Sequence, residues 1–204
     1  MAGPGRPRRF DEAHERQLLL DASIAVMERN GFDDVAVADI LAEADVSTRS
    51  FYRHFASKDE LVCAIYQREA QRIAEQITLR TKNAADPVEA LDAWLSAMLA
   101  VGHHPRKAKR AAILASPGAR RAEGYTETVL AALELFAEPL RDTISAGRAA
   151  GMMPLATDED VELLQSLVWG AGGVPPGRIS QRSFEQSLAM VRSFAHRALG
   201  IRDA

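Results

Sequence analysis

The chain contains little cysteine and no long hydrophobic run. Its 204 residues include a single cysteine, Cys63, so no internal disulfide forms. Cys63 stands in the apolar run LVCAIY, which indicates a small core residue rather than a nucleophile. No run of about 18 apolar residues is present, and the N-terminal MAGPGRPRRF lacks the apolar centre of a signal peptide. These absences predict a cytoplasmic protein without a membrane span or redox chemistry.

Motifs of the common enzyme classes are also missing. The sequence contains no glycine-rich phosphate loop and no Ser-His-Asp or cysteine-nucleophile arrangement. His103 and His104 are adjacent, but neighbours on a helix point about 100° apart. No acidic or cysteine partner stands at a metal-ligand spacing from them. The sequence therefore predicts no enzyme, no cofactor and no metal site, and it assigns the basic run 106–110 to a solvated loop or a helix start.

Period-two alternation typical of strands is absent, and apolar residues recur with helical periodicity throughout. We therefore predict an all-α chain. Ser57 and Glu60 form a capping box, which marks the start of a long helix. The expected N-terminal helices cover 11–30, ended by Gly31, then 36–44, 48–55 and 57–81.

The two short helices and the turn between them have the spacing of a helix-turn-helix unit. On a helical wheel, Phe51 and Phe55 share one side of the second short helix, and Tyr52 lies at the margin. The aromatic side would anchor the helix, whereas polar groups opposite would reach bases and phosphates. A solvated face on a core helix is the alternative. The polar side carries Arg49, Ser50, Arg53 and His54.

Charge is distributed unevenly. The net charge is −3, and the first 60 residues hold 12 acidic against 8 basic residues. Local distribution matters more than this sum for a polyanionic partner. Two segments without acidic residues are 1–9, with Arg6, Arg8 and Arg9, and 46–58, with Arg49, Arg53 and Lys58.

The stretch VSTRSFYRHFASKDEL, residues 46–61, resembles the signature of TetR-type transcription regulators. Upstream, NGFDDVAVADILAEADVS resembles that family's Gly-aromatic helix end and second helix, so the resemblance covers about residues 12–66. The family usually has Thr where this chain has Ala36, which removes a capping hydroxyl. It usually has Gly where this chain has Asp45, a residue that tolerates a left-handed turn.

The resemblance implies a set of DNA contacts. Thr48, Arg49 and Ser50 would lead the second short helix into the major groove, with Arg53 and His54 on the same side. Arg49 is the best candidate to read guanine, because a guanidinium binds O6 and N7 together. A structural role is the alternative for His54. The remaining predicted contacts are Ser47 as the helix cap, and Tyr52 and Lys58 as phosphate contacts.

The N-terminal arm leaves two interpretations open. Arg6, Arg8 and Arg9 either belong to a disordered tail or lie in an adjacent minor groove and add salt-sensitive affinity.

From about residue 80, proline and glycine punctuate a second helical region. Asp86 caps a helix with Pro87 at its first position, and a further helix is expected over 121–146. In regulators of the resembled type, a small molecule binds between helices of this domain and two subunits pair through its last two. Ordinary core packing is the alternative for the large apolar residues that we place near a pocket, which are Trp94, Met98, Phe136 and Trp169.

The expected organisation is a three-helix DNA-binding domain, 1–58, joined through the helix 57–81 to a ligand-binding and dimerisation domain, 59–204. One apolar stripe near the C-terminus fits either a four-helix dimer interface or packing within the domain. By resemblance, the protein is a homodimeric repressor that a small-molecule effector releases from a palindromic operator in double-stranded DNA. An architectural DNA-binding protein and an enzyme on a related fold are the alternatives. The stripe consists of Phe184, Leu188, Val191 and Ala195.

Overall fold

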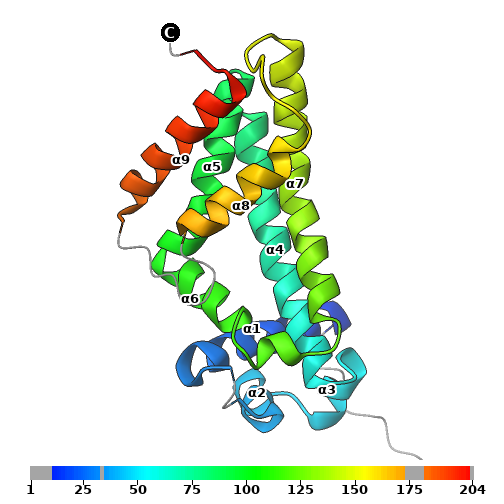
Figure 1. The fold of residues 1–204 in the computed structure, drawn as a ribbon. Coiled ribbons are helices and arrows are strands. Elements are labelled where there is room, and N and C mark those ends of the chain that lie inside the picture. The colour runs from blue at the N-terminus through cyan, green and yellow to red at the C-terminus, as the bar shows by residue number, and fades with distance from the viewer. Residues whose placement is uncertain (1–10, 33–34, 173–181, 203–204) are drawn as a thin grey trace, which may run out of the picture.

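The computed structural model describes residues 11–32, 35–172 and 182–202. In these ranges every regular element is helical, which confirms the all-α prediction. Figure 1 shows the first three helices at one end of an elongated molecule and the remaining helices extending away from them. The elements are α1 (Glu12–Asn30), α2 (Val37–Ala44), α3 (Thr48–His54), α4 (Lys58–Lys82), α5 (Pro87–His103), α6 (Pro105–Leu114), the 3₁₀ turn η1 (Ala119–Arg121), α7 (Tyr125–Ala149), α8 (Asp160–Gly172) and α9 (Phe184–Leu199).

Local signals set most helix ends as predicted. Gly31 follows α1 with φ 82°, a left-handed value that glycine adopts without strain. Asp45 follows α2 with φ 51°, so the turn survives the absence of glycine there. The Ser57 hydroxyl accepts from the Glu60 N–H at 3.1 Å and caps α4. Asp86 caps α5 in the same way, accepting from the N–H groups of the next turn at 2.8 and 2.9 Å.

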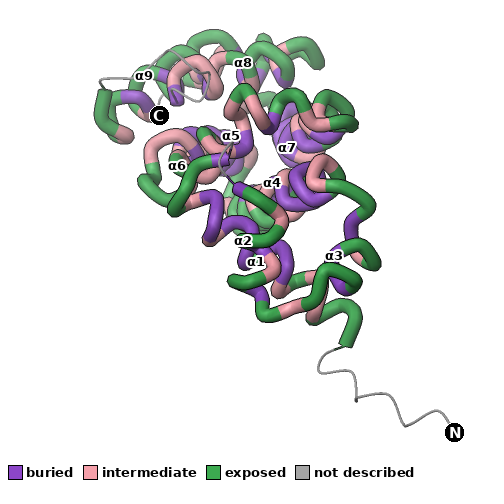
Figure 2. The backbone as a smooth tube through the Cα atoms, turned by 90° about the horizontal axis from the view of Figure 1, so that it is seen from below, coloured by how far each residue is buried: buried purple, intermediate pink, exposed green. Residues whose placement is uncertain are grey.

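Two hydrophobic cores divide the molecule, and α4 contributes to both. Its first turns, 61–65, pack with α1, α2 and α3 in the N-terminal core. Its later turns, from Ala70 to Ile77, pack with α5, α7, α8 and α9. At 25 residues and about 1.5 Å each, α4 is about 37 Å long, enough to span both. Figure 2 shows the buried positions on the faces that the helices turn towards one another.

The helix α6 joins the two parts a second time. It follows α5 after His104, packs against both α5 and α1, and buries Leu114 in the N-terminal core. The basic run 106–110 therefore lies in the first turns of a helix, which is the second of the two predicted alternatives. Figure 1 shows α6 crossing from the end of α5 to the first three helices.

Candidate nucleic-acid interface and interior cavity

The helix α3 is held down by its aromatic side. Phe51 and Phe55 are 0% and 1% exposed, and their ring centroids lie 5.8 Å apart. The Ser47 hydroxyl accepts from the Ser50 N–H at 3.2 Å, so Ser47 caps the helix as predicted. Burial of two phenyl rings fixes which side of a seven-residue helix faces solvent, although so short a helix has little stability of its own.

The start of α3 is its most accessible part. Thr48 and Arg49 are both exposed. Neither side chain forms a hydrogen bond or ion pair with any residue in the described ranges. Tyr52 is 58% exposed, and its ring packs edge-on against Phe51 at 5.3 Å rather than inward. Thr48, Arg49 and the Tyr52 hydroxyl are therefore available to a partner outside the chain.

The other predicted contacts on α3 are occupied by Glu15 of α1. His54 Nε2 and Arg53 Nη1 lie 3.0 and 2.9 Å from Glu15 Oε2. Ser50 also hydrogen-bonds Glu15 and is only 3% exposed. The expectation that Ser50 and His54 face outward is wrong, because α1 packs against this side of α3 and brings its carboxylate there. Arg53 stays partly exposed, with 38% of its side chain accessible.

These donors change the acidity of the Glu15 carboxyl group. The hydrogen bond from Ser50 lowers its pKa most, burial opposes the shift, and His54 and the Arg53 charge lower the pKa further. The carboxylate is thus stabilised in its ionised form. It ties the end of α3 to α1.

Lys58 has an internal partner as well. Its ammonium group donates to the Val35 carbonyl oxygen at 2.7 Å and lies 5.0 Å from the centroid of the Phe32 ring. These contacts fix the segment before α2 against the start of α4. The phosphate contact predicted for Lys58 stays a prediction. Arg6, Arg8 and Arg9 lie outside the described residues.

A cavity of about 330 Å³ lies among α4, α5, α6, α7 and α8. Phe136 and Trp169 line it, as predicted, with ring centroids 6.2 Å apart. Trp94 and Met98 do not line it. They are 0% and 2% exposed within the core, where Trp94 Nε1 donates to the Phe136 carbonyl at 2.9 Å. For these two residues the alternative interpretation, ordinary core packing, holds.

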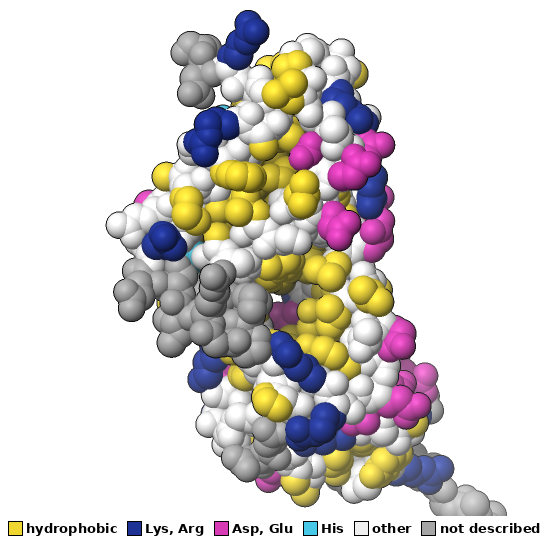
Figure 3. Space-filling view, viewed as in Figure 1, with side chains coloured by type: hydrophobic (Ala, Val, Ile, Leu, Met, Phe, Trp, Pro, Cys, Tyr) yellow, Lys and Arg dark blue, Asp and Glu magenta, His cyan; other side chains and the backbone are white. Residues whose placement is uncertain are grey.

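Basic side chains from α4 and α6 border the cavity, a site that was not predicted from the sequence. The sequence does contain a signal for this basic border, because segment 105–122 holds six basic and no acidic residues. Figure 3 shows the mouth as a hollow with hydrophobic side chains beside it and Lys and Arg side chains below. Tyr66, at the wall, stays neutral because burial raises its pKa to about 12. The basic lining residues are Arg72, Arg106, Lys107 and Arg110.

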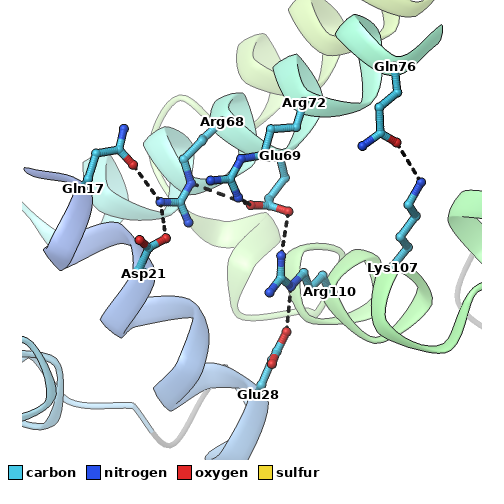
Figure 4. A network of polar contacts seen from close by, with 9 residues as sticks. All are labelled: Gln17, Asp21, Glu28, Arg68, Glu69, Arg72, Gln76, Lys107 and Arg110. Carbon is cyan, nitrogen blue, oxygen red and sulfur yellow. Dashed lines mark hydrogen bonds and ion pairs between the residues drawn. The ribbon is translucent and has the colours of Figure 1, made fainter. Parts of the chain in front are cut away.

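A polar network connects this border with the N-terminal helices (Figure 4). Arg110 on α6 lies 2.7 Å from Glu28 on α1 and 3.2 Å from Glu69 on α4. The hydrogen bond with Glu28 raises the pKa of Arg110, and the Glu69 charge adds to this effect. Arg68 on α4 contacts Asp21 on α1 at 2.7 Å. The contacts with Glu28 and Asp21 reach α1, whereas the contact with Glu69 joins α6 to α4.

Two further properties bear on function. Among the described residues, no three His, Cys, Asp or Glu side chains are grouped in a way that suits a metal ion. Within the same ranges, none of the helices combines the length and apolar character of a membrane span.

A capped short helix with an exposed N-terminal end, set after a three-residue turn, defines a helix-turn-helix protein. Residues 19–65 match the model of the bacterial regulatory proteins of the tetR family. This match confirms, over residues 19–65, the resemblance to the tetR family stated from the sequence.

Known relatives agree with this assignment. The HTH-type transcriptional repressor KstR of Mycolicibacterium smegmatis is 32% identical over 62 residues, which cover 30% of this chain and 30% of that protein. The chain thus spans less than a third of this relative. A putative transcriptional regulator from Pseudomonas aeruginosa PAO1 shares the fold over 94% of this chain and 93% of its own, with a TM-score of 0.76 at 19% identity. FadR from Bacillus subtilis, solved in complex with stearoyl-CoA, covers 91% and 99%, with a TM-score of 0.65 at 17% identity.

Proposed function

We propose that the protein is a sequence-specific DNA-binding transcriptional regulator, a repressor released from a palindromic operator by a small-molecule effector. The observation that carries the proposal is the start of α3, where Thr48 and Arg49 are exposed and unpaired among the described residues. The family match and the repressor KstR support the same function. The similarity of this chain to transcriptional regulators also supports a binding protein without catalytic activity.

The proposed division of labour follows the two cores. Residues 1–58 would form the DNA-binding domain and 59–204 the sensing and dimerisation domain, with α4 crossing between them. Residues 61–65 of α4 pack in the same core as Phe51 and Phe55 of α3, so a movement of α4 would shift α3 as well. The cavity, in contrast, lies against the middle of α4, between Tyr66 and Gln76.

A homodimer would use the outer faces of α8 and α9. Val191 and Ala195 are buried against the protein's own core, so the stripe expected at an interface serves internal packing instead. The exposed apolar side chains are Leu163, Met190 and Phe194, at 63%, 40% and 51%. Figure 3 shows hydrophobic side chains gathered over these two helices. An isologous contact there would present two α3 helices related by a two-fold axis.

The regulatory mechanism is a population shift. An effector that favours one arrangement of the second domain moves the two α3 helices out of register with successive major grooves. A hundredfold change in operator affinity corresponds to about 2.7 kcal/mol of differential binding. The complex of FadR with stearoyl-CoA supports the expectation that this fold accommodates a ligand.

Selection from a randomised double-stranded DNA library with the full-length protein tests the proposal. We expect an inverted repeat to be enriched. Arg49→Ala should lose discrimination at a guanine of each half-site, by about 1–3 kcal/mol per contact. Arg80→Ala is the matched control, since it removes an exposed positive charge from the far end of α4. Equal affinity and selectivity of Arg49→Ala and wild type would contradict the assignment of base reading.

A further inference from the structure

We propose that the cavity binds an amphipathic anion, with its apolar body against Phe136 and Trp169 and its anionic group at Lys107 and Arg110. We further infer that this anion competes with Glu28 for the Arg110 guanidinium. The inference rests on the proposed function, because it names the class of effector and the contact through which it acts.

The interior of the cavity suits an apolar body. Its volume of about 330 Å³ falls within the roughly 300–1,000 Å³ typical of small-molecule sites. Trp169 carries a buried indole N–H without a hydrogen-bond partner among the described residues, so an oxygen acceptor on the ligand would satisfy it. The apolar wall is formed by Ala70, Ile73, Val101, Leu114, Phe136 and Trp169.

The border of the cavity suits a negative charge. Four arginine and lysine side chains line it against one carboxylate, Glu69. Lys107 is half-buried, and among the described residues its ammonium group donates only to the Gln76 side-chain oxygen, at 3.0 Å. Burial lowers the pKa of Lys107, and the Arg80 charge lowers it further, so an anion at this point would offset both effects. A cationic ligand would be repelled, and a neutral one would leave the ammonium without a counter-charge.

Arg110 would connect the bound anion to α1. Its guanidinium lies at the cavity border and contacts Glu28 and Glu69 at the same time, as Figure 4 shows. Arg110 donates through Nε to Glu28 and through Nη1 to Glu69, so an anion that takes the Nε donor removes the contact with Glu28. Loss of the contact with Glu28 would remove the ion pair between α6 and α1. Since α1 holds α3 through Glu15, the ligand and the operator become coupled.

Direct binding to the full-length protein, without DNA, tests the ligand class. Decanoate, decyl phosphate and decanoyl-CoA are compared with decanol and decyltrimethylammonium, all below their micelle concentrations, by calorimetry and Trp fluorescence. We expect at least one anion to bind at least tenfold more tightly than decanol, and the cation not to bind. The ranking of the three anions identifies the preferred headgroup. Equal or tighter binding of decanol, or no binding of any anion, would overturn the proposal.

Variants on one helix test the position of the anion. Lys107→Gln should weaken anion binding at least tenfold and leave decanol binding unchanged. Lys109→Gln is the matched control, because Lys109 is exposed on α6 and does not line the cavity. If both variants bind the anion as the wild type does, Lys107 is not part of the site.

Glu28→Gln tests the competition for Arg110. If the anion competes with Glu28, this variant should bind it several-fold more tightly than the wild type, whereas a purely structural ion pair predicts unchanged or weaker binding. Circular dichroism verifies the fold. Because no DNA is present, failure of operator binding leaves this test intact. Conversely, an anion that binds but does not release the operator would refute the effector response and not the ligand class.

Discussion

At the scale of single residues, Glu15 determines what α3 offers to a partner. Its carboxylate contacts Ser50, Arg53 and His54, and the N-terminal end of α3 stays exposed. Polar side chains on one side of a short helix thus serve two purposes. Ser50, Arg53 and His54 contact α1, whereas Thr48 and Arg49 at the start remain exposed for base edges.

The lowered pKa of Glu15 makes part of the stability dependent on pH. A carboxyl group whose pKa is depressed on folding contributes stability above its ordinary value of 4.5 and loses it as pH falls through the folded value. At neutral pH, Glu15→Gln should reduce the free energy of unfolding by about 1–3 kcal/mol, as expected for a charged hydrogen bond.

Urea unfolding between neutral pH and pH 3 measures this effect. The difference between wild type and Glu15→Gln should shrink as the pH falls below 4.5. Glu162→Gln, at an exposed carboxylate on α8, is the control. A difference that stays constant with pH would show that ionisation of Glu15 does not stabilise the fold.

At the scale of elements, the connection from α7 to α8 depends on close packing at one glycine. A Cβ at Gly147 would lie 2.5 Å from Met153 Sδ, and Met153 is fully buried. Gly147→Ala should therefore reduce the free energy of unfolding by about 1–3 kcal/mol, the range for overpacking a core.

Gly170 in α8 provides the matched comparison. A Cβ there meets no atom within 4 Å, so Gly170→Ala should be neutral or stabilise by about 0.5–1 kcal/mol through helix propensity. Thermal and urea unfolding of both variants measure the contrast. If the two substitutions have the same effect, the contact with Met153 is not what limits position 147.

The helix α6 shows where sequence periodicity stops being informative. Its 10 residues form fewer than three turns, and its basic positions suit a solvated loop equally well. Only the packing of Leu114 into the N-terminal core fixes its orientation. That orientation brings Lys107 and Arg110 to the cavity.

At the scale of the whole molecule, the outer faces of α8 and α9 determine the proposed oligomer. Leu163→Asp would place a charge in the dimer interface, and a buried unpaired charge is strongly unfavourable. We expect this variant to sediment as a monomer at concentrations where the wild type is a dimer.

Leu79→Asp tests whether the effect is specific to that face. Leu79 lies on α4 and has the same 63% exposure as Leu163, but it is outside α8 and α9. It should leave the sedimentation coefficient unchanged. Dissociation of both variants, or of neither, would contradict an interface on α8 and α9.

The sequence by itself determined the helical fold, the helix-turn-helix unit and most helix ends. These features depend on local rules, namely apolar periodicity, caps such as Ser57 and Asp86, and a tolerated left-handed residue at Asp45. The resemblance of residues 46–61 also predicted that Arg49 lies at the leading end of α3, and base reading by Arg49 stays a prediction.

Only the tertiary structure decided which side chains remain free. Glu15 and Ser50 are 35 positions apart in the sequence, and no local pattern relates them. The same holds for Arg110 with Glu28, and for the cavity that α6 closes against α4. Such contacts depend on how helices cross one another, which is set by the sum of many packing interactions rather than by any one segment.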